Sequence, residues 1–418
     1  MNQAQTFRAK WIWTGEGLPK QDCVLTIASG RVVALIAWKD FPNKSQEIHD
    51  YGDCCLLPGF INSHTHLEFS DLKQPIPPGK NFAEWILRVV QHRTSRSFSR
   101  DDSVEEAVDT GTALVLNVVH GASSDSDPFS DRANGQFQIP FAELMSTTDL
   151  RLRQTWQSAR AMMRICATSD RAHDGLQMGL SPHAPYTTTG KLIRQTVDRC
   201  RRFKLPVMMH LAETREELDW IASGDGPLGE MLEMMVGPMG LPTSDRLTLP
   251  GYVNELLRAP KTLLIHGNYL DNDSRDALSN QRKTAAVVFC PRTHQHFGHD
   301  RYPLDQMLRQ GIRVLLGTDS RASNPDLSIW EEARKIASDF PTISPEKIIQ
   351  MITSDASVFL GLDRSVGFLR PNAIGIMNAV PCTSQGPESV LEEILAGDSK
   401  PISFIRPDTK HEPTKFRE

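Results

Sequence analysis

The chain has 418 residues, with 46 Lys and Arg against 51 Asp and Glu, and a formal net charge of −5 at pH 7. This length suits one large domain plus a smaller one. The mild acidic balance excludes the strongly basic face of a nucleic-acid-binding protein, and no run approaches the roughly 18 apolar residues of a membrane span. We therefore expect neither nucleic acid nor a membrane as a partner.

The cysteines indicate a reducing compartment. There are seven of them, and they form no CxxC pair or regular framework. An odd number of scattered cysteines favours free thiols that pack as small apolar residues. The N-terminal region also lacks the apolar core of a secretory signal, so we expect a cytoplasmic protein.

The first part of the chain predicts a strand-rich lobe. Short apolar segments are separated by Gly-containing or polar turns, at positions 7–13, 23–27, 31–38 and 48–56.

The middle of the chain alternates short apolar runs with amphipathic segments. The apolar runs lie at 56–62, 112–119, 138–144, 176–181, 206–210, 262–266, 284–289 and 313–317. The helix candidates between them lie at 82–92, 102–110, 150–167, 190–203, 271–280 and 304–309. Eight such units predict an α/β fold with a closed (β/α)8 barrel. An open doubly wound sheet stays possible, although no GxGxxG motif follows the first strand.

The remaining segments complete the expected domain organisation. Residues 223–260, rich in Gly and Pro, exceed the length of one helix, and we interpret them as an insertion over the barrel mouth. Helical patterns resume at 328–339 and 345–360, and strand-like sequence returns at 366–381. We expect a β-rich lobe from 1–56 and 362–400, a barrel from 57–361, and a fraying polar tail from 401–418.

Histidines and one aspartate stand where the predicted barrel strands end. His64 and His66 are two residues apart on an extended segment, so both side chains point to one face. The others follow the fourth, fifth, sixth and eighth strands: His183, His210, His266 and Asp319. The carboxyl ends of barrel strands converge on one site. A lone strand-end histidine is usually capped or solvated, but this combination predicts a metal site. Imidazoles with one carboxylate suit zinc, with iron or manganese as alternatives.

Five motifs resemble the amidohydrolase superfamily. They are PGFINSHTHL around His64 and His66, SPHAPYT around His183, HLAET from His210, IHGNYL around His266 and LGTDS around Asp319. More narrowly, they resemble its cytosine deaminase and triazine hydrolase branch, with guanine and S-adenosylhomocysteine deaminases as relatives. It covers residues 7 to 381, and family members carry a composite β lobe from both chain ends.

The resemblance implies a role for each of these residues. His64, His66, His210 and Asp319 bind one divalent metal ion. Glu213 matches the general acid and base, and His266 matches the residue that orients the attacking water or polarises the substrate. His183 matches a substrate contact. The alternatives are a surface Glu213 that opens a helix and a merely structural His266.

Together these residues predict hydrolytic deamination. A bound ion lowers the pKa of water toward about 7, the ionised Asp319 accepts a proton, and Glu213 carries protons to the ring and to the departing amine. His266 stabilises the developing tetrahedral centre. The PCxxC motif of a different deaminase fold is absent. The place of the carboxylated lysine of two-metal relatives reads LSPHAP, so we expect one metal.

The substrate-contact predictions have two readings each. The segment 290–299, which in relatives commonly reads Asn-Pro-x-Ser-Asn, here places Arg292 and His296 at the barrel mouth, either to bind an anionic substrate group or as a solvated loop. Arg321 either binds substrate or pairs with Glu331 or Glu332. Trp85 either stacks on a heterocycle or is a core aromatic.

Alternatives also exist for the role of Glu68 and for the reaction. Glu68 either supports a metal ligand or caps a turn. Alternatives to deamination are hydrolytic dechlorination, cleavage of another C–N bond, and a non-catalytic ligand-binding relative. A small molecule is the expected partner, and the resemblance makes a homodimer plausible.

Overall fold

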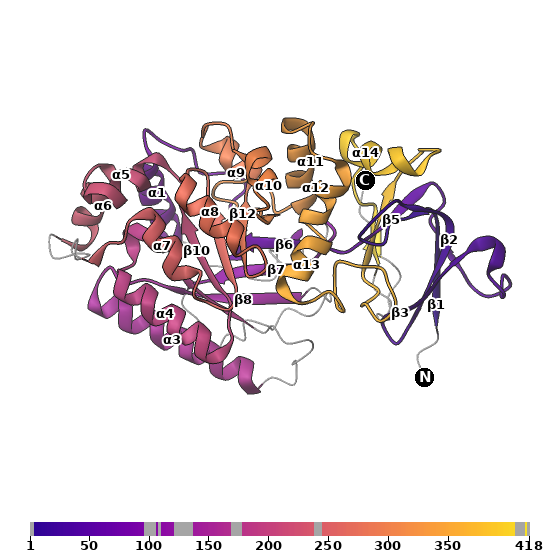
Figure 1. The fold of residues 1–418 in the computed structure, drawn as a ribbon, viewed down its shortest axis with the longest axis horizontal. Helices are drawn as coiled ribbons and strands as arrows, with labels where there is room; N and C mark the ends of the chain where they lie inside the picture. The colour runs from indigo at the N-terminus through magenta and orange to yellow at the C-terminus, as the bar shows by residue number, and fades with distance from the viewer. Residues whose placement is uncertain are drawn as a thin grey trace.

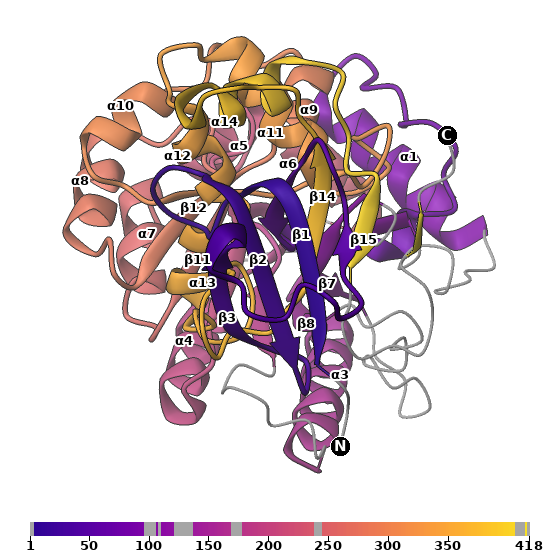
Figure 2. The same ribbon diagram turned by 90° about the vertical axis from the view of Figure 1, so that its right-hand side faces the viewer.

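The computed structural model describes residues 4–95, 106–107, 110–120, 137–168, 178–237, 245–405 and 414–415. A barrel surrounded by helices lies beside a smaller lobe made mainly of strands (Figure 1). Turned by 90°, the molecule presents the lobe in front of the barrel (Figure 2). No helix among the described residues is long and apolar enough to cross a membrane.

Eight parallel strands form the barrel, as the alternating pattern predicts. They are β6 (Phe60–Thr65), β7 (Thr112–Val119), β8 (Phe137–Leu144), β9 (Gly179–Pro182), β10 (Val207–Leu211), β11 (Thr262–His266), β12 (Ala285–Phe289) and β13 (Val314–Leu316). Each pairs with the next in chain order. The ring closes where the backbone N–H groups of Thr318 and Asp319 donate to the carbonyl of His64, at 3.1 and 3.2 Å. The open doubly wound alternative is therefore wrong.

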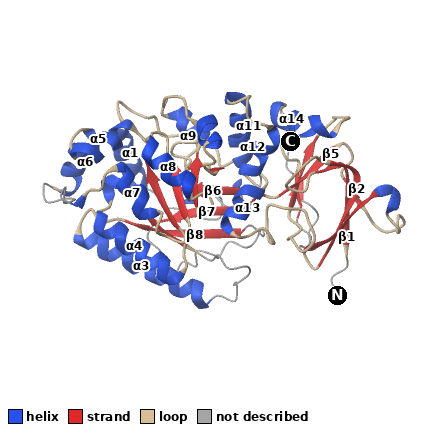
Figure 3. Ribbon diagram, viewed as in Figure 1, coloured by secondary structure: helices blue, strands red, loops and turns tan. Residues whose placement is uncertain are grey.

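The barrel strands have nearly continuous apolar sequences because both of their faces are covered. Every residue of β7, β10, β11 and β12 is buried. One face points into the barrel and the other packs against the surrounding helices, so strand-by-strand alternation is lost. Figure 3 shows these strands in red inside the ring of helices.

Most of the helices around the barrel lie at predicted segments, but the helix candidates do not include 215–223 and 291–296. The helices are α1 (Phe82–Ser95), α3 (Asp149–Thr168), α4 (Gly190–Phe203), α5 (Arg215–Ser223), α8 (Asn272–Asn280), α9 (Pro291–His296), α10 (Leu304–Arg309) and α11 (Ile329–Asp339). The start of α4 illustrates the local signals, because the hydroxyl of Thr189 accepts from the N–H of Leu192. Lys204 ends the same helix in the left-handed conformation. The expected helix at 102–110 lies mostly outside the described residues.

The segment predicted as an insertion contributes two helices, α6 (Pro227–Val236) and α7 (Leu249–Leu256). Helix α6 lies at the end of the barrel farthest from the lobe (Figure 1). Its residues Met231, Leu232, Met235 and Val236 line the central cavity.

One expected helix is divided in two. The predicted helix at 345–360 is α12 (Pro345–Met351) followed by α13 (Ser354–Leu360). Thr353 between them has φ −138° and ψ −99°, which is not a helical conformation. Its hydroxyl donates to the carbonyl of Ile349, four residues earlier. Apolar periodicity continues across this break, which explains why the sequence pattern does not reveal it.

The lobe contains strands from both chain ends. Its strands are β1 (Gln5–Ile12), β2 (Lys20–Ala28), β3 (Arg31–Ala37), β4 (His49–Asp50), β5 (Cys54–Pro58), β14 (Met377–Pro381), β15 (Ser403–Ile405) and β16 (Thr414–Lys415). β14 pairs antiparallel with β5, and β15 and β16 extend the sheet beyond β14. The expectation that residues 401–418 only fray is therefore wrong for β15 and β16. The exact domain boundaries stay a prediction.

Helix α14 (Pro387–Ala396) belongs to the barrel side of the molecule although its sequence lies within the expected lobe. Its residues Val390, Leu391, Ile394 and Leu395 are buried in the same apolar core as the barrel helices. It lies beside α11 and α12 (Figure 1).

Candidate active site

Three imidazoles and one carboxylate meet at the carboxyl end of the barrel. The Nε2 atom of His210 lies 3.3 Å from the Nε2 atoms of both His64 and His66. Oδ1 of Asp319 lies 3.4 Å from Nε2 of His64 and 3.8 Å from Nε2 of His66. The four side chains come from the ends of β6, β10 and β13, as the positions at strand ends predict.

These distances fit a tetrahedral metal site. Ligand bonds of about 2.0–2.1 Å place neighbouring ligand atoms about 3.3–3.4 Å apart in a tetrahedron. Ligand atoms of His64, His210, His266 and Asp319 lie within 4.8 Å of one another, so His266 borders the same point. All of these side chains are buried. The residues present therefore fit one divalent ion.

The protonation states of the histidines suit metal binding. Burial is the main reason why the pKa values of His64, His66 and His266 lie well below the usual value for histidine. A neutral imidazole has the free lone pair that a metal requires. The Nδ1–H of His210 donates to the carbonyl of His183 at 3.0 Å, which leaves its Nε2 lone pair to face the other ligands.

The backbone is strained where these residues leave their strands. Ala212, His266 and Asp319 have φ values of +56°, +65° and +57°. Residues other than glycine rarely adopt this left-handed region, and such strain is concentrated at functional sites. Here it turns the chain at the strand ends. The hydroxyl of Tyr302 donates to the carbonyl of His266 at 3.1 Å and so supports one of these turns.

Polar neighbours orient Asp319. The hydroxyl of Ser323 donates to Oδ2 of Asp319 at 2.5 Å. The hydroxyl of Thr65 donates to the backbone carbonyl of Asp319 at 2.9 Å. With Oδ2 engaged, Oδ1 is the oxygen that faces the histidines.

Glu213 lies inside the site and not on the surface. Its Oε1 is 3.5 Å from Nε2 of His266, and its side chain is buried. Burial, followed by the charges of Asp319 and Glu217, raises the pKa of Glu213 well above its usual value. A carboxyl group with a raised pKa is suited to hold a proton and to donate it.

A capping arrangement holds the segment that carries Glu213. The hydroxyl of Thr214 accepts from the N–H of Glu217 at the start of α5. The Glu217 carboxylate in turn accepts from the N–H groups of Ala212 and Glu213, at 2.8 and 3.1 Å. The Nδ2 of Asn268 donates to the carbonyl of Glu213 at 2.8 Å. This network resembles a capping box shifted toward the preceding residues.

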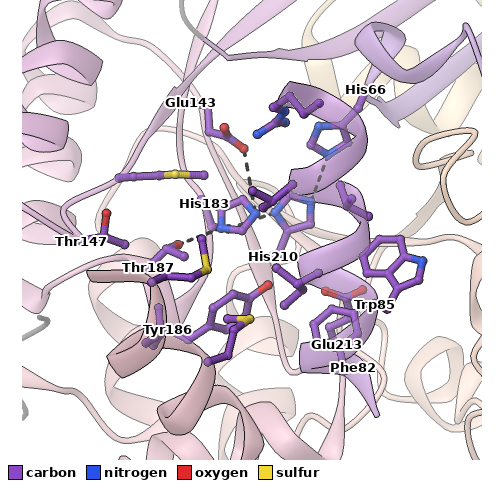
Figure 4. Close-up of a pocket in the computed structure, with 18 of the residues that line it drawn as sticks. His66, Phe82, Trp85, Glu143, Thr147, His183, Tyr186, Thr187, His210 and Glu213 are labelled. Carbon is purple, nitrogen blue, oxygen red and sulfur yellow. Dashed lines mark hydrogen bonds and ion pairs between the residues drawn. The ribbon is translucent and has the colours of Figure 1, made fainter. Parts of the chain in front are cut away.

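A cavity of about 360 Å³ opens from the metal ligands. Its walls include the aromatic side chains Phe82, Trp85 and Tyr186, and His183 and Glu213 also line it (Figure 4). Trp85 stacks on Phe82 with ring centroids 5.6 Å apart. Trp85 is thus part of the packed wall and also faces the cavity.

His183 lines the cavity beside the metal ligand His210. Its Nδ1 is 2.7 Å from the hydroxyl of Thr187, and its ring centroid is 5.1 Å from that of His210. Burial lowers the pKa of His183 to about 3, so its imidazole is neutral at physiological pH.

Arg292 is not placed to bind substrate. Its guanidinium donates to Glu332 and Asp326, each at 2.6 Å, and it is not among the described residues that line the cavity. The same Glu332 accepts from Asn324. The sequence does not reveal this, because its partners lie more than thirty residues away along the chain.

His296 and Arg321 are also engaged by the protein outside the cavity. Nε2 of His296 lies 3.0 Å from the carbonyl of Ile76. Arg321 donates to Glu106 at 2.5 Å and to the carbonyl of Leu72 at 2.6 Å. Its carboxylate partner is therefore Glu106, whereas the expected alternatives were Glu331 and Glu332.

Glu68 pairs with Arg93 on α1, which lines the cavity.

Four residues that line the cavity or lie beside it were not predicted from the sequence. They are Arg93 on α1, His120 after β7, Glu143 near the end of β8 and Arg151 on α3. Glu143 and His120 occupy the ends of the third and second barrel strands. The strand-end rule that identifies the other site residues would have found both, had it been applied to these strands.

The fold and the site together define a metal-dependent hydrolase of the barrel type. The sequence model of the amidohydrolase family matches residues 55–387, and the chain belongs to that family. Aminodeoxyfutalosine deaminase of Deinococcus radiodurans is 27% identical over 323 residues, which cover 75% of this chain and 74% of the relative. A 5-methylthioadenosine/S-adenosylhomocysteine deaminase of Saccharophagus degradans is 24% identical over 391 residues, 86% of this chain and 79% of the relative.

Solved structures show the same fold. Helicobacter pylori aminofutalosine deaminase in complex with methylthio-coformycin has a TM-score of 0.81 at 17% identity, with 96% of this chain and 98% of that one covered. A zinc-bound adenosine deaminase from Xanthomonas campestris has a TM-score of 0.77 at 17% identity, with 98% and 92% covered. The predicted superfamily and barrel are therefore confirmed.

Proposed function

We propose that this enzyme removes an amino group hydrolytically from an aromatic heterocycle in a nucleoside-like compound. One observation carries this proposal. Glu213, a buried carboxyl group suited to move protons, lies beside a convergent cluster of histidines and Asp319 at the bottom of a cavity. Relatives that cover most of the chain are named as deaminases of adenosine-like compounds, which supports the same reaction class.

In this proposal the metal ligands are His64, His66, His210 and Asp319. Zinc is the proposed ion, because imidazole nitrogens about 3.3 Å apart suit its tetrahedral geometry. The zinc in the Xanthomonas campestris structure is consistent with that choice. Iron and manganese accept similar ligands. We propose a single ion, since His183 follows the fourth barrel strand where two-metal relatives carry a lysine.

The bound ion would supply Lewis-acid chemistry and lower the pKa of a water molecule from about 15.7 toward 7. Asp319 takes a proton from the attacking water. As the new C–O bond forms at the amino-bearing carbon, Glu213 protonates the adjacent ring nitrogen. His266 stabilises the charge that develops there. Glu213 then takes up the proton of the new hydroxyl group and passes it to the departing amine as the C–N bond breaks. The proton held by Asp319 returns to Glu213, and the products are ammonia and a ring carbonyl.

We propose that His183 and Trp85 contact the substrate, because both face the cavity. The apolar side chains of α6 and α1 would cover the rest of a nucleoside-sized ligand. We further propose a cytoplasmic location, which seven free buried cysteines favour. A homodimer is a further expectation, and light scattering of the purified protein would check it.

The test combines metal analysis with product detection. Purified protein should contain close to one divalent ion per chain and release ammonia from at least one member of a panel of nucleosides, purines, pterins and aminotriazines. Chloride release from chlorotriazines without ammonia release would favour the dechlorination alternative. Bound metal with no turnover across the panel would contradict the proposal and favour a ligand-binding relative.

A further inference from the structure

Glu143 is a buried carboxylate in the cavity wall that the proposed reaction does not use. It lies near the end of β8, and its side chain is only 1% exposed. Its Oε2 accepts a hydrogen bond from Nδ1 of His120. Figure 4 shows its carboxylate directed toward His183.

The surroundings of Glu143 keep it ionised. Nε2 of His120 lies within hydrogen-bonding distance of a guanidinium nitrogen of Arg151, and Nδ1 of the same ring donates to Oε2 of Glu143. Although burial acts to raise it, the pKa of Glu143 is held well below its usual value, mainly by the charge of His120 and its hydrogen bond. Glu143 is therefore an anion inside the cavity.

The second carboxylate oxygen lacks a donor. Nε2 of His183 lies 4.0 Å from this oxygen. That separation exceeds hydrogen-bonding distance, which for such pairs is about 2.7–3.2 Å. No described residue donates a hydrogen bond to Oε1 of Glu143. Because Glu143 lines the cavity, an oxygen that the protein leaves without a donor can accept a hydrogen bond from a ligand there.

The local charges favour a neutral donor. Arg93 and Arg151 both line the cavity, and each is already matched to one carboxylate. Arg93 pairs with Glu68, and Arg151 acts on Glu143 through His120. Because the positive charges of Arg93 and Arg151 at least balance the carboxylates of Glu68 and Glu143, a cationic ligand group would gain no net attraction. A hydroxyl group offers a proton without adding charge.

The position of Glu143 suits the substituent of a substrate and not its reacting ring. His183 lies between Glu143 and the metal ligand His210, with 4.0 Å from its Nε2 to Glu143 and 5.1 Å between the two imidazole centroids. A ligand group at Glu143 would thus be separated from the reacting carbon by about the width of the His183 ring.

We propose that Oε1 of Glu143 accepts a hydrogen bond from a hydroxyl group on the substrate, so that the enzyme selects heterocyclic amines with a sugar-like substituent over bare ring amines. This assignment rests on the proposed function, because it concerns the same cavity. Glu143 is a specificity-determining residue in this view.

Binding of two product-type nucleosides to the zinc-loaded protein tests the assignment. Calorimetry would compare inosine with 2′,3′-dideoxyinosine, which lacks the two ribose hydroxyls and is not a substrate for deamination. Hydrogen bonds to charged groups predict that inosine binds about 10- to 150-fold more tightly. In Glu143→Ala this preference should fall to near unity with unchanged metal content. Glu230→Ala, which removes an exposed carboxylate of α6, should keep the preference.

Two results would overturn the assignment: no preference for inosine in the wild-type protein, or an undiminished preference in Glu143→Ala. Should Glu143→Ala fail to fold, Glu143→Gln keeps the side-chain shape without the charge, and an unchanged preference in that variant would be equally decisive. Ammonia release from adenosine, measured separately, tests the proposed function. An enzyme that deaminates adenosine but ignores the ribose hydroxyls would refute only the role of Glu143.

Discussion

Two buried carboxyl groups share the cavity, and their immediate neighbours give them different chemistry. Asp319 accepts a hydrogen bond from Ser323 on one oxygen and faces His64 with the other. Glu213 lies beside His266, and burial raises its pKa. Because the surroundings of the two carboxyl groups differ, one can serve as a metal ligand while the other serves as a proton donor.

Replacing Asp319 tests the metal site. In Asp319→Asn the charged ligand is lost, so we expect loss of bound metal, loss of activity, or both, with little change in fold. Metal analysis and circular dichroism would measure these effects. The exposed Asp276 on α8 provides a control, and Asp276→Asn should retain metal and activity. Full turnover by Asp319→Asn would remove Asp319 from the mechanism.

Replacing Glu213 tests proton transfer separately from metal binding. Glu213→Gln should retain the metal but lower kcat by about 10²–10⁴-fold, because an amide cannot shuttle protons. Rates and metal content would be measured on the same preparation. Glu230→Gln, on the exposed face of α6, should behave as wild type. A Glu213→Gln rate near wild type would contradict the assigned role.

At the scale of elements, the start of α5 decides where Glu213 points. Thr214 caps the helix, and Glu217 binds the two backbone N–H groups that precede it. The helix-capping sequence Thr-Arg-Glu-Glu at 214–217 thus holds the segment that carries Glu213 in the site. Helix α6, in the segment between the fifth and sixth barrel strands, supplies the apolar side of the cavity.

Glu217 predicts a pH dependence of stability. Burial raises its pKa from 4.5 to about 7 in the folded protein. The folded state therefore holds a proton that the unfolded state loses between these values, and stability falls as pH rises through this window. Glu217→Gln removes this titration. Denaturant titration would measure the unfolding free energies of the wild type and of Glu217→Gln. From pH 4 to pH 8, the wild type should lose on the order of 3 kcal/mol of stability relative to the variant. A pH-independent difference would show that Glu217 titrates normally.

At the scale of the whole molecule, the proposed ion connects distant parts of the barrel. His64 lies on β6, His210 lies on β10, and Asp319 follows β13. A ligand that binds only the folded state stabilises it by mass action.

Metal removal should therefore lower stability as well as activity. We expect chelated protein to melt at a lower temperature and to recover both properties when zinc is restored. An excess of free ion of about 100 times Kd corresponds to about 2.7 kcal/mol of stabilisation. Calorimetric melting of chelated and reloaded protein would measure the change. Identical melting curves for protein shown to differ in metal content would contradict a site that bridges the barrel.

Much of the architecture could be predicted because burial on both faces produces strong apolar runs. The segments 112–119 and 262–266 coincide with β7 and β11, and 190–203 coincides with α4. The break at Thr353 and the strands β15 and β16 could not be predicted, because they depend on contacts rather than on apolar periodicity.

By itself the sequence determined which side chains stand at the strand ends, and in a closed barrel those ends must converge. His64, His66, His210 and Asp319 could be found for that reason. Only the tertiary structure decided that Arg292, His296 and Arg321 form hydrogen bonds with other residues of the protein and that Glu143 lines the cavity. The physical reason is that the partners of a charged side chain are chosen by distance in space, and most of these partners lie tens to hundreds of residues away along the chain.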